Sequence, residues 1–442
     1  MPFACSNSTL PFLDLQNNPS VRDQFFAPLM HVFDNYMRER LDCPEIRDEE
    51  FLHLGCARVL SQAASGRDFL QQQQEILDSD IKRSSFFATL HSARRERMLQ
   101  EASLQLYLRG CGSFQDPGED LLGAFAQLRG RALWAVDGHQ IEHACHALKD
   151  KKGRYVGAKN LYLLCLHSGL MHNLSPVQGD GSYRHEMPVL REQLPQWLQH
   201  HQAKPKSLPP ILVLDPAFVD KQFWTRMKLL TQAKAVMITR TKENMKPEKY
   251  STLPWDPHAD INRGVTGQYL VGFDGAVLMR LIQYTDPETG EEYEFLTTVG
   301  EEVPPGLIAW LYLMRWRIEK VFDTTKNKLQ ETKAWATGPV AQNIQGHFVA
   351  LTHNLLVLFR HYLKRQHGLE EQKIIHKRAN RLKERQRQAK ANSRTIHPLH
   401  RKMPPVIQMS LQFIRTLRNH FFRPVSMTAS LPRFQTSLST YL

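Results

Sequence analysis

Residues 210–241 read PILVLDPAFVDKQFWTRMKLLTQAKAVMITRT, and this stretch decides the fold class. It opens with a short apolar run, PILVLD at 210–215, which has the length and composition of a buried strand. A helical pattern follows at 218–233, and a second β-type run, AVMITRT, fills 235–241. Strands that alternate with helices in this way predict an α/β domain whose sheet is covered by helices.

The segments before residue 210 extend the same sheet. Three further β-type runs precede it: ALWAVDG at 132–138, KNLYLLCLHS at 159–168 and LMHNLSPVQ at 170–178. A Ser-Gly turn joins the last two runs, and a helical pattern then covers 186–201. This order predicts a mixed α/β sheet.

The segments after residue 241 change character twice. Residues 242–303 are polar and β-like, and within them 269–299 predicts a pair of hairpins. Two long helical patterns follow at 304–329 and 338–366, each introduced by proline. A β-rich block is therefore expected to interrupt the α/β domain before its last helices.

The charge of the chain is concentrated near its C-terminus. The 442 residues include 57 Lys and Arg against 44 Asp and Glu, a formal charge of +13, and the segment 373–402 alone carries +10. Such a segment attracts polyanions such as nucleic acid, although a basic run can equally be the solvated face of a helix. With 42% hydrophobic and 23% charged residues, the composition excludes a wholly disordered or fibrous chain.

Cysteine usage and hydropathy indicate the compartment. The six cysteines are scattered without a Cys-x-x-Cys pair, which argues against a disulfide framework and a zinc ribbon. The N-terminus lacks the pattern of a secretory signal, and the apolar stretches 307–313 and 348–359 are too short to span a bilayer. We expect a soluble cytoplasmic protein with no membrane partner.

Two aspartates follow apolar strand patterns, Asp137 in ALWAVDG and Asp215 in PILVLD. An aspartate at the carboxyl end of a buried strand faces the rim of the sheet, where metal and phosphate sites are assembled. The alternative for either residue is an ordinary helix-capping aspartate.

The helical pattern at 304–329 carries a row of polar side chains. Tyr312, Arg315, Glu319 and Lys326 fall within a sector roughly 60° wide at about 100° per residue. Arg315 and Glu319 could form a simple surface ion pair, but that pair would not account for the tyrosine and the lysine.

These residues resemble the DDE transposases of bacterial insertion sequences, specifically the IS-four group, whose signature is a Tyr-Arg-Glu-Lys helix with this spacing. The likeness covers roughly residues 130 to 360. It departs from the family at His139, where a threonine is frequent, and at Pro216, where an arginine is frequent.

The resemblance implies an RNase H-like fold and a set of functional residues. Asp137, Asp215 and Glu319 would be the catalytic carboxylates and the ligands of two Mg²⁺ ions, for which Mn²⁺ could substitute. Carboxylates are the ligands that Mg²⁺ prefers, and a pair of such ions suits phosphodiester cleavage. Tyr312, Arg315 and Lys326 would contact phosphates at the transposon end. Trp255 is a candidate for holding a flipped base, with a core tryptophan as the alternative.

The resemblance also implies a division of the chain and a function. The expected regions are a helical N-terminal DNA-binding region (1–125), the first part of an RNase H-like catalytic core (126–241), a β-rich insertion (242–303), the helical completion of the core (304–366) and a basic C-terminal region (367–442). The function would be that of a DNA transposase that binds terminal inverted repeats, cleaves beside them and joins the 3′-OH ends to target DNA. We expect it to act as a homodimer on DNA, in the bacterial nucleoid.

Three alternatives remain open from the sequence. One is a nuclease of the same fold that hydrolyses DNA without joining it, and another is a catalytically inactive DNA-binding protein. The third is a zinc peptidase, because His139-Gln140-Ile141-Glu142-His143 matches a His-x-x-Glu-His motif. That motif needs a helix with both histidines on one face, whereas here it follows a strand pattern directly.

Overall fold

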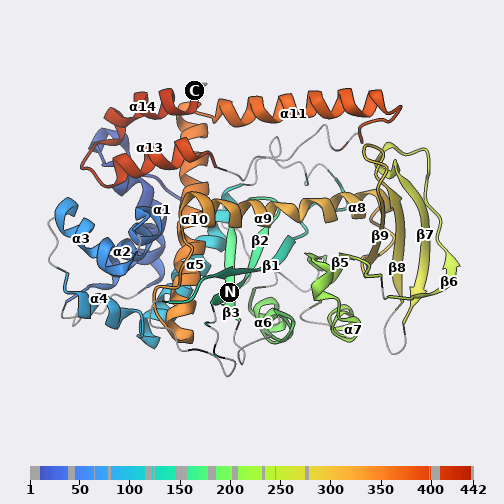
Figure 1. The fold of residues 1–442 in the computed structure, drawn as a ribbon, viewed down its shortest axis with the longest axis horizontal. Coiled ribbons are helices and arrows are strands. Elements are labelled where there is room, and N and C mark those ends of the chain that lie inside the picture. Colours follow the sequence, from blue (N-terminus) through green and yellow to red (C-terminus); the bar gives the residue numbers. More distant parts are fainter. Residues whose placement is uncertain are drawn as a thin grey trace.

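The structure is a computed structural model of the whole chain (Figure 1). It describes residues 10–37, 45–63, 65–77, 81–114, 122, 125–144, 149, 153, 155, 157–177, 186–201, 208–230, 234–243, 245–273, 278–397, 399 and 409–439.

A mixed sheet forms the centre of the molecule. Its first five strands are β1 (Leu133–Ile141), β2 (Ala158–Cys165), β3 (Met171–Pro176), β4 (Ile211–Leu214) and β5 (Val236–Arg240). They lie side by side in the order β3-β2-β1-β4-β5, where β1, β2 and β3 are antiparallel and β4 and β5 run parallel to β1. This arrangement confirms the mixed α/β sheet and is consistent with an RNase H-like fold.

The β-rich block continues this sheet. Its strands are β6 (Glu248–Thr252), β7 (Val265–Gly272), β8 (Met279–Thr285) and β9 (Glu292–Thr297). Successive strands pair as antiparallel hairpins, as the sequence predicts for the last three, and β9 then pairs with β5. The result is one nine-stranded sheet in the order β3-β2-β1-β4-β5-β9-β8-β7-β6.

Helices cover both faces of the sheet. They are α6 (Glu186–His201), α7 (Lys221–Leu229), α8 (Pro305–Met314), α9 (Trp316–Asp323) and α10 (Pro339–His367). In Figure 1, α6 and α7 lie on one side of the first five strands and α8 to α10 on the other. All four residues of β4 are buried, which is the state expected of a parallel strand between two helical layers.

The flanking regions are helical, as the sequence predicts. The N-terminal helices are α1 (Val21–Tyr36), α2 (Asp48–Ser61), α3 (Gly66–Leu77), α4 (Arg83–Thr89) and α5 (Ala93–Ser113), and the C-terminal helices are α11 (Gln372–Ala391), α13 (Leu411–Phe421) and α14 (Met427–Ser439). One cluster of buried apolar side chains, from Leu10 to Leu438, runs through the sheet and through these helices other than α11. At its centre, α10 meets α2 so closely that a Cβ atom on Gly55 would overlap the Phe348 ring.

Helix α11 leaves this helical body and passes above α8 and α9 toward the β-rich end of the molecule (Figure 1). There Arg385 forms a close ion pair with Glu288, and Arg394 donates to the carbonyl oxygen of Thr289. Both acceptors lie in the turn between β8 and β9. Along the described part of the chain, no helix is long and apolar enough to cross a membrane.

Candidate active site

The sheet brings Asp137 and Asp215 next to each other. The parallel strands β1 and β4 pair from Leu133↔Ile211 to Val136↔Leu214, and each aspartate is the residue that follows the last pair. Asp215 ends its strand as predicted. Asp137 does not, because β1 continues to Ile141 in its pairing with β2, so the expectation that Asp137 ends a strand was wrong.

Backbone N–H groups fix the orientation of both aspartate side chains. Oδ1 of Asp137 accepts from the N–H of Gly138 at 2.8 Å, and Oδ1 of Asp215 accepts from the N–H of Ala217 at 2.9 Å. Asp215 is thereby the N-cap of a short 3₁₀ helix, Pro216–Phe218, so the capping alternative describes a contact that it makes. In both aspartates, Oδ2 is left for another partner.

The signature helix is divided into three parts. The sequence predicts one helix over 304–329, but α8 and α9 meet at Arg315 in a tightened step, where the Arg315 N–H bonds to the Tyr312 carbonyl at 3.0 Å. After α9, residues Thr324–Lys328 form a π-helical turn. The hydroxyl groups of Thr324 and Thr325 donate to the backbone carbonyls four residues earlier, at 3.1 and 3.2 Å. Such bonds compete with the regular hydrogen bonds of an α-helix.

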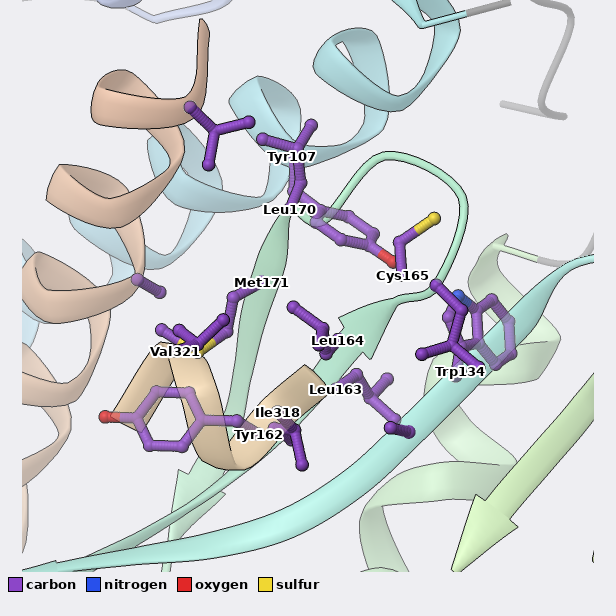
Figure 2. Packing of buried hydrophobic residues seen from close by; sticks show 14 of the residues in the cluster. Tyr107, Trp134, Tyr162, Leu163, Leu164, Cys165, Leu170, Met171, Ile318 and Val321 are labelled. Carbon is purple, nitrogen blue, oxygen red and sulfur yellow. The ribbon is translucent and has the colours of Figure 1, made fainter. Parts of the chain in front are cut away.

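The apolar face of α9 packs on the sheet. Figure 2 shows Ile318 and Val321 of α9 among the buried side chains of β2, which include Tyr162 and Leu163. This packing leaves Glu319 on the half-exposed side of the helix.

The Arg315 guanidinium joins the three predicted carboxylates. Nη1 lies 3.5 Å from Oδ2 of Asp137, and Nη2 lies 3.6 Å from Oδ2 of Asp215 and 2.9 Å from Oε1 of Glu319. The Arg315 side chain is only 7% exposed, whereas the three carboxylates are 24%, 37% and 38% exposed. Three acids that are far apart in the sequence therefore surround one buried cation at the edge of solvent.

The electrostatics of this cluster shift several pKa values. Burial raises the pKa of Asp137 to about 6, against the opposing effects of the Gly138 N–H and Arg315, and nearby Asp215 and Glu186 raise it further. Burial lowers the pKa of Arg315, but Tyr312 and the three carboxylates outweigh burial, so that this pKa is raised overall. Burial also raises the pKa of Tyr312.

Of the other two residues of the predicted row, Tyr312 lies next to Arg315, close enough to Asp215 for that carboxylate to affect its pKa, and Lys326 lies farther along the chain. Tyr312 is buried at the end of α8, with its ring 5.1 Å from that of Phe295 and 5.9 Å from the Arg315 guanidinium carbon. Lys326 lies exposed in the π-helical turn, close enough to His139 to add to the lowering of the His139 pKa by burial. The row is therefore preserved in part: Tyr312 stays beside Arg315, whereas Lys326 lies beyond α9 in the π-helical turn.

A further carboxylate, which the sequence analysis did not single out, lies beside Asp137. Glu186 begins α6 and forms a close ion pair with Lys159 of β2. The pair covers Gly138, because a Cβ atom at this position would overlap Oε1 of Glu186. The Asp-Gly sequence hints at a close approach, but no pattern in the sequence identifies its partner.

The zinc peptidase alternative fails on geometry. His139 lies on strand β1, where its ring stacks on Phe322 at 4.6 Å, and His143 stacks on Tyr155 at 4.4 Å. The two rings therefore have separate surroundings, without the helix that the motif needs. Cys145 and His146, which follow the motif closely in the sequence, lie outside the described part of the chain.

The donor set of the cluster suits a hard divalent cation. Carboxylate oxygens are the groups that Mg²⁺ and Mn²⁺ prefer, and Asp137, Asp215 and Glu319 present them from three different elements. In this structure those oxygens face Arg315, and the described residues contain no group of three or more His, Cys, Asp or Glu already arranged to hold a metal ion.

Comparison with known proteins agrees with this arrangement. The model of a family described as Transposase DDE domain matches residues 129–355, slightly more than half of the chain, and the match includes all three carboxylates. A search of the curated proteins finds no match. The chain therefore belongs to the family of transposases that carry the DDE domain.

Proposed function

We propose that the protein is a DNA transposase of the IS-four group that binds the terminal inverted repeats of an insertion sequence, cleaves beside them and joins the 3′-OH ends to target DNA. The observation that carries this proposal is the convergence of Asp137, Asp215 and Glu319 on Arg315. Family membership supports transposition in general, and the steps named here are our inference from the site.

In the proposed mechanism, Asp137, Asp215 and Glu319 hold two Mg²⁺ ions, or Mn²⁺ in their place. Such ions, when bound, activate the attacking oxygen and stabilise the leaving oxygen of a phosphodiester. The backbone N–H groups at Gly138 and Ala217 restrict the two aspartates to one orientation, so that each offers Oδ2. Asp137 must give up its proton to act as a ligand, and its raised pKa makes that loss incomplete near pH 6.

The proposed DNA path runs from the carboxylates along α9 to α11. The Arg315 guanidinium can contact a phosphate through two N–H groups, and exposed Lys326 can contact one as a point charge. Burial lowers the pKa of Lys328 against the opposing effects of Asp323 and Glu371, and the nearby ammonium groups of Lys377 on α11 and Lys320 on α9 lower it further. Basic side chains of α9 and α11 therefore share one region of the surface, which would follow a DNA backbone.

Several finer parts of the proposal rest on the resemblance alone. They are the IS-four assignment, the roles of Tyr312 and Trp255, the DNA-binding role of residues 1–125, the homodimer on DNA and the localisation to the bacterial nucleoid. Trp255 is half-buried in the β-rich block, which is compatible with either a base contact or a core role.

The test uses linear DNA that carries the sequences flanking the gene, with Mg²⁺ and the purified protein. We expect cleavage next to short inverted repeats, followed by joining to a second DNA. Glu319→Gln should reduce cleavage by about 10³-fold, because loss of a metal ligand removes several kcal/mol of transition-state stabilisation, and should leave DNA binding nearly unchanged.

A matched control is Glu370→Gln, which removes a carboxylate paired with Lys364 at 2.9 Å on the surface. This variant should cleave like the wild type. Undiminished cleavage by the Glu319 variant would remove Glu319 from the site. Cleavage without joining would favour the nuclease, and binding without cleavage by the wild type would favour an inactive DNA-binding protein.

A further inference from the structure

We propose that Arg315 is an exchangeable internal counter-ion, which holds the three carboxylates together until a divalent cation displaces it and thereby releases it for a DNA phosphate. This inference rests on the proposed function, because it concerns the ions and the DNA that the site would bind. It assigns to Arg315 a role before DNA is bound, which phosphate contact alone does not include.

The first support is the assignment of each carboxylate oxygen. Oδ1 of Asp137 and Oδ1 of Asp215 are already occupied by backbone N–H groups. The oxygens that remain, Oδ2 of both aspartates, face the Arg315 guanidinium, as does Oε1 of Glu319. The oxygens best placed to bind a metal ion are therefore the ones that Arg315 now contacts.

The second support is the balance of charge. Three ionised carboxylates around one guanidinium retain a formal charge of −2, and close carboxylates that lose their counter-ion repel one another. Without a metal ion, Arg315 limits this repulsion. With a metal ion, the cation takes over that role, and a guanidinium that stays in place would be repelled by it.

The third support is the place of Arg315 in the backbone. It is the residue between α8 and α9, at the tightened step of the helix, so its side chain leaves from a junction and not from the middle of a regular helix. Its Nε atom is buried and has no hydrogen-bond partner among the described residues, so its contacts with the carboxylates are made through the two Nη atoms. The end of the guanidinium can therefore exchange one set of anions for another without breaking a hydrogen bond at Nε.

The exchange predicts a coupling between metal and DNA. A metal ion that displaces Arg315 makes the guanidinium available to a phosphate, and a phosphate that binds the guanidinium clears the oxygens for the metal ion. Because linkage is reciprocal, each ligand should raise the affinity of the other by the same factor.

The experiment measures Mn²⁺ binding to the full-length protein by electron paramagnetic resonance, first without DNA. Arg315→Gln removes the competing cation and keeps a polar side chain, so we expect it to bind Mn²⁺ about fivefold or more tightly than the wild type. Arg315→Lys keeps the charge but cannot bridge three carboxylates, so its gain should be smaller. Arg263→Gln is the matched control, because it removes an arginine paired with Asp260 at 2.6 Å in the β-rich block, and it should not change Mn²⁺ affinity.

The second measurement adds a double-stranded DNA that ends at one flanking repeat and is already cut there, so that no cleavage is required. This DNA should tighten Mn²⁺ binding to the wild type by about fivefold or more and should leave the affinity of Arg315→Gln unchanged. Circular dichroism verifies that each variant is folded, and Arg315→Lys replaces the glutamine variant in both measurements if the latter does not fold.

Two outcomes would overturn the inference. If folded Arg315→Gln binds Mn²⁺ no more tightly than the wild type, Arg315 organises the carboxylates and does not compete with the ion, while the proposed function stands. If neither protein binds Mn²⁺ with or without DNA, the metal site itself is wrong and the proposed function falls with it.

Discussion

The Asp137 carboxyl is buried beside other acids, and burial is the main reason that its pKa rises to about 6. In an unfolded chain the pKa of an aspartate is about 3.9. Between about pH 3.9 and pH 6, folding is therefore accompanied by the uptake of a proton at Asp137. Ionised Asp137 therefore destabilises the folded chain above about pH 6, and this penalty disappears below about pH 4. Functional sites commonly carry such a penalty, because the arrangement that binds a ligand is unfavourable without it.

The expected consequence is a stabilising substitution at the site. In metal-free buffer at pH 7.5, Asp137→Asn should raise the free energy of unfolding by about 2 kcal/mol, since asparagine can still accept the Gly138 N–H but carries no charge. At pH 4 the gain should fall to about 0.5 kcal/mol, because the wild-type carboxyl is then protonated in the folded chain and about half protonated in the unfolded chain. Urea denaturation at the two pH values measures both quantities. An equal gain at both would point to packing and not to the charge.

At the scale of single elements, the position of α8 depends on a close contact with the β-rich block. Gly306 lies in the first turn of α8, and its N–H donates to Oδ1 of Asn262 at 3.1 Å. A Cβ atom at this position would overlap the backbone carbonyl oxygen of Ile261, which cannot move as a side chain would. The start of α8 is therefore fixed against the 3₁₀ helix Asp260–Asn262.

Gly306→Ala should consequently lower the free energy of unfolding by about 1–3 kcal/mol, the usual range for overpacking. Gly110→Ala in α5 is the matched control, because there the added Cβ meets only the tip of the Leu170 side chain. That variant should be nearly neutral, or gain from the higher helix propensity of alanine. Thermal unfolding measures the stability of both variants. Equal losses of stability would show that the backbone contact at Gly306 is not the cause.

Elements with buried side chains carry an apolar pattern and can be predicted from the sequence. Elements without buried side chains lack this pattern and are missed. The apolar runs of β4 and β5 are visible because both strands are buried. By contrast, β6 is exposed along its whole length and has no apolar pattern. The interruption after α9 depends on Thr324 and Thr325 hydroxyls, whose bonding a helical periodicity does not reveal.

The same limit applies to the candidate site. The residue types and spacing single out all three carboxylates and Arg315, and these four side chains meet in space. The sequence gives no sign that Arg315 contacts both aspartates as well as Glu319, since this depends on how α8 and α9 are placed across β1 and β4. It also gives no sign of Glu186, whose approach to Asp137 depends on where α6 begins.

At the scale of the whole molecule, α11 carries most of the excess positive charge across the length of the structure. Arg381, Lys383 and Lys390 are exposed on it, while Arg385 and Arg394 hold its far end to the β8–β9 turn. The far end of the helix is therefore fixed to the β-rich block, and Lys383 and Lys390 lie on one helix face, about 20° apart, with Arg381 on the opposite face.

If α11 follows a DNA backbone, the salt dependence of binding should reveal it. Replacing Arg381, Lys383 and Lys390 together by glutamine should reduce the slope of log affinity against log salt by about 2, at about 0.9 per phosphate contact, because Lys383 and Lys390 share one helix face. Exchanging lysine and arginine at the same three positions keeps the charge and should keep the slope. Filter binding across a salt series measures the slope for both variants. An unchanged slope in the glutamine variant would show that these side chains of α11 face solvent and do not contact DNA.

The continuity of the sheet has a mechanical consequence. The antiparallel pairs Ile238↔Thr297, Thr239↔Leu296 and Arg240↔Phe295 join β9 to β5, and β5 in turn pairs with β4, the strand that Asp215 follows. This pairing opposes a hinge rotation of the β-rich block relative to the rest of the sheet. A force on the outer strands β6 and β7 would instead tilt the sheet as a whole, and the Asp215 carboxylate would move with it.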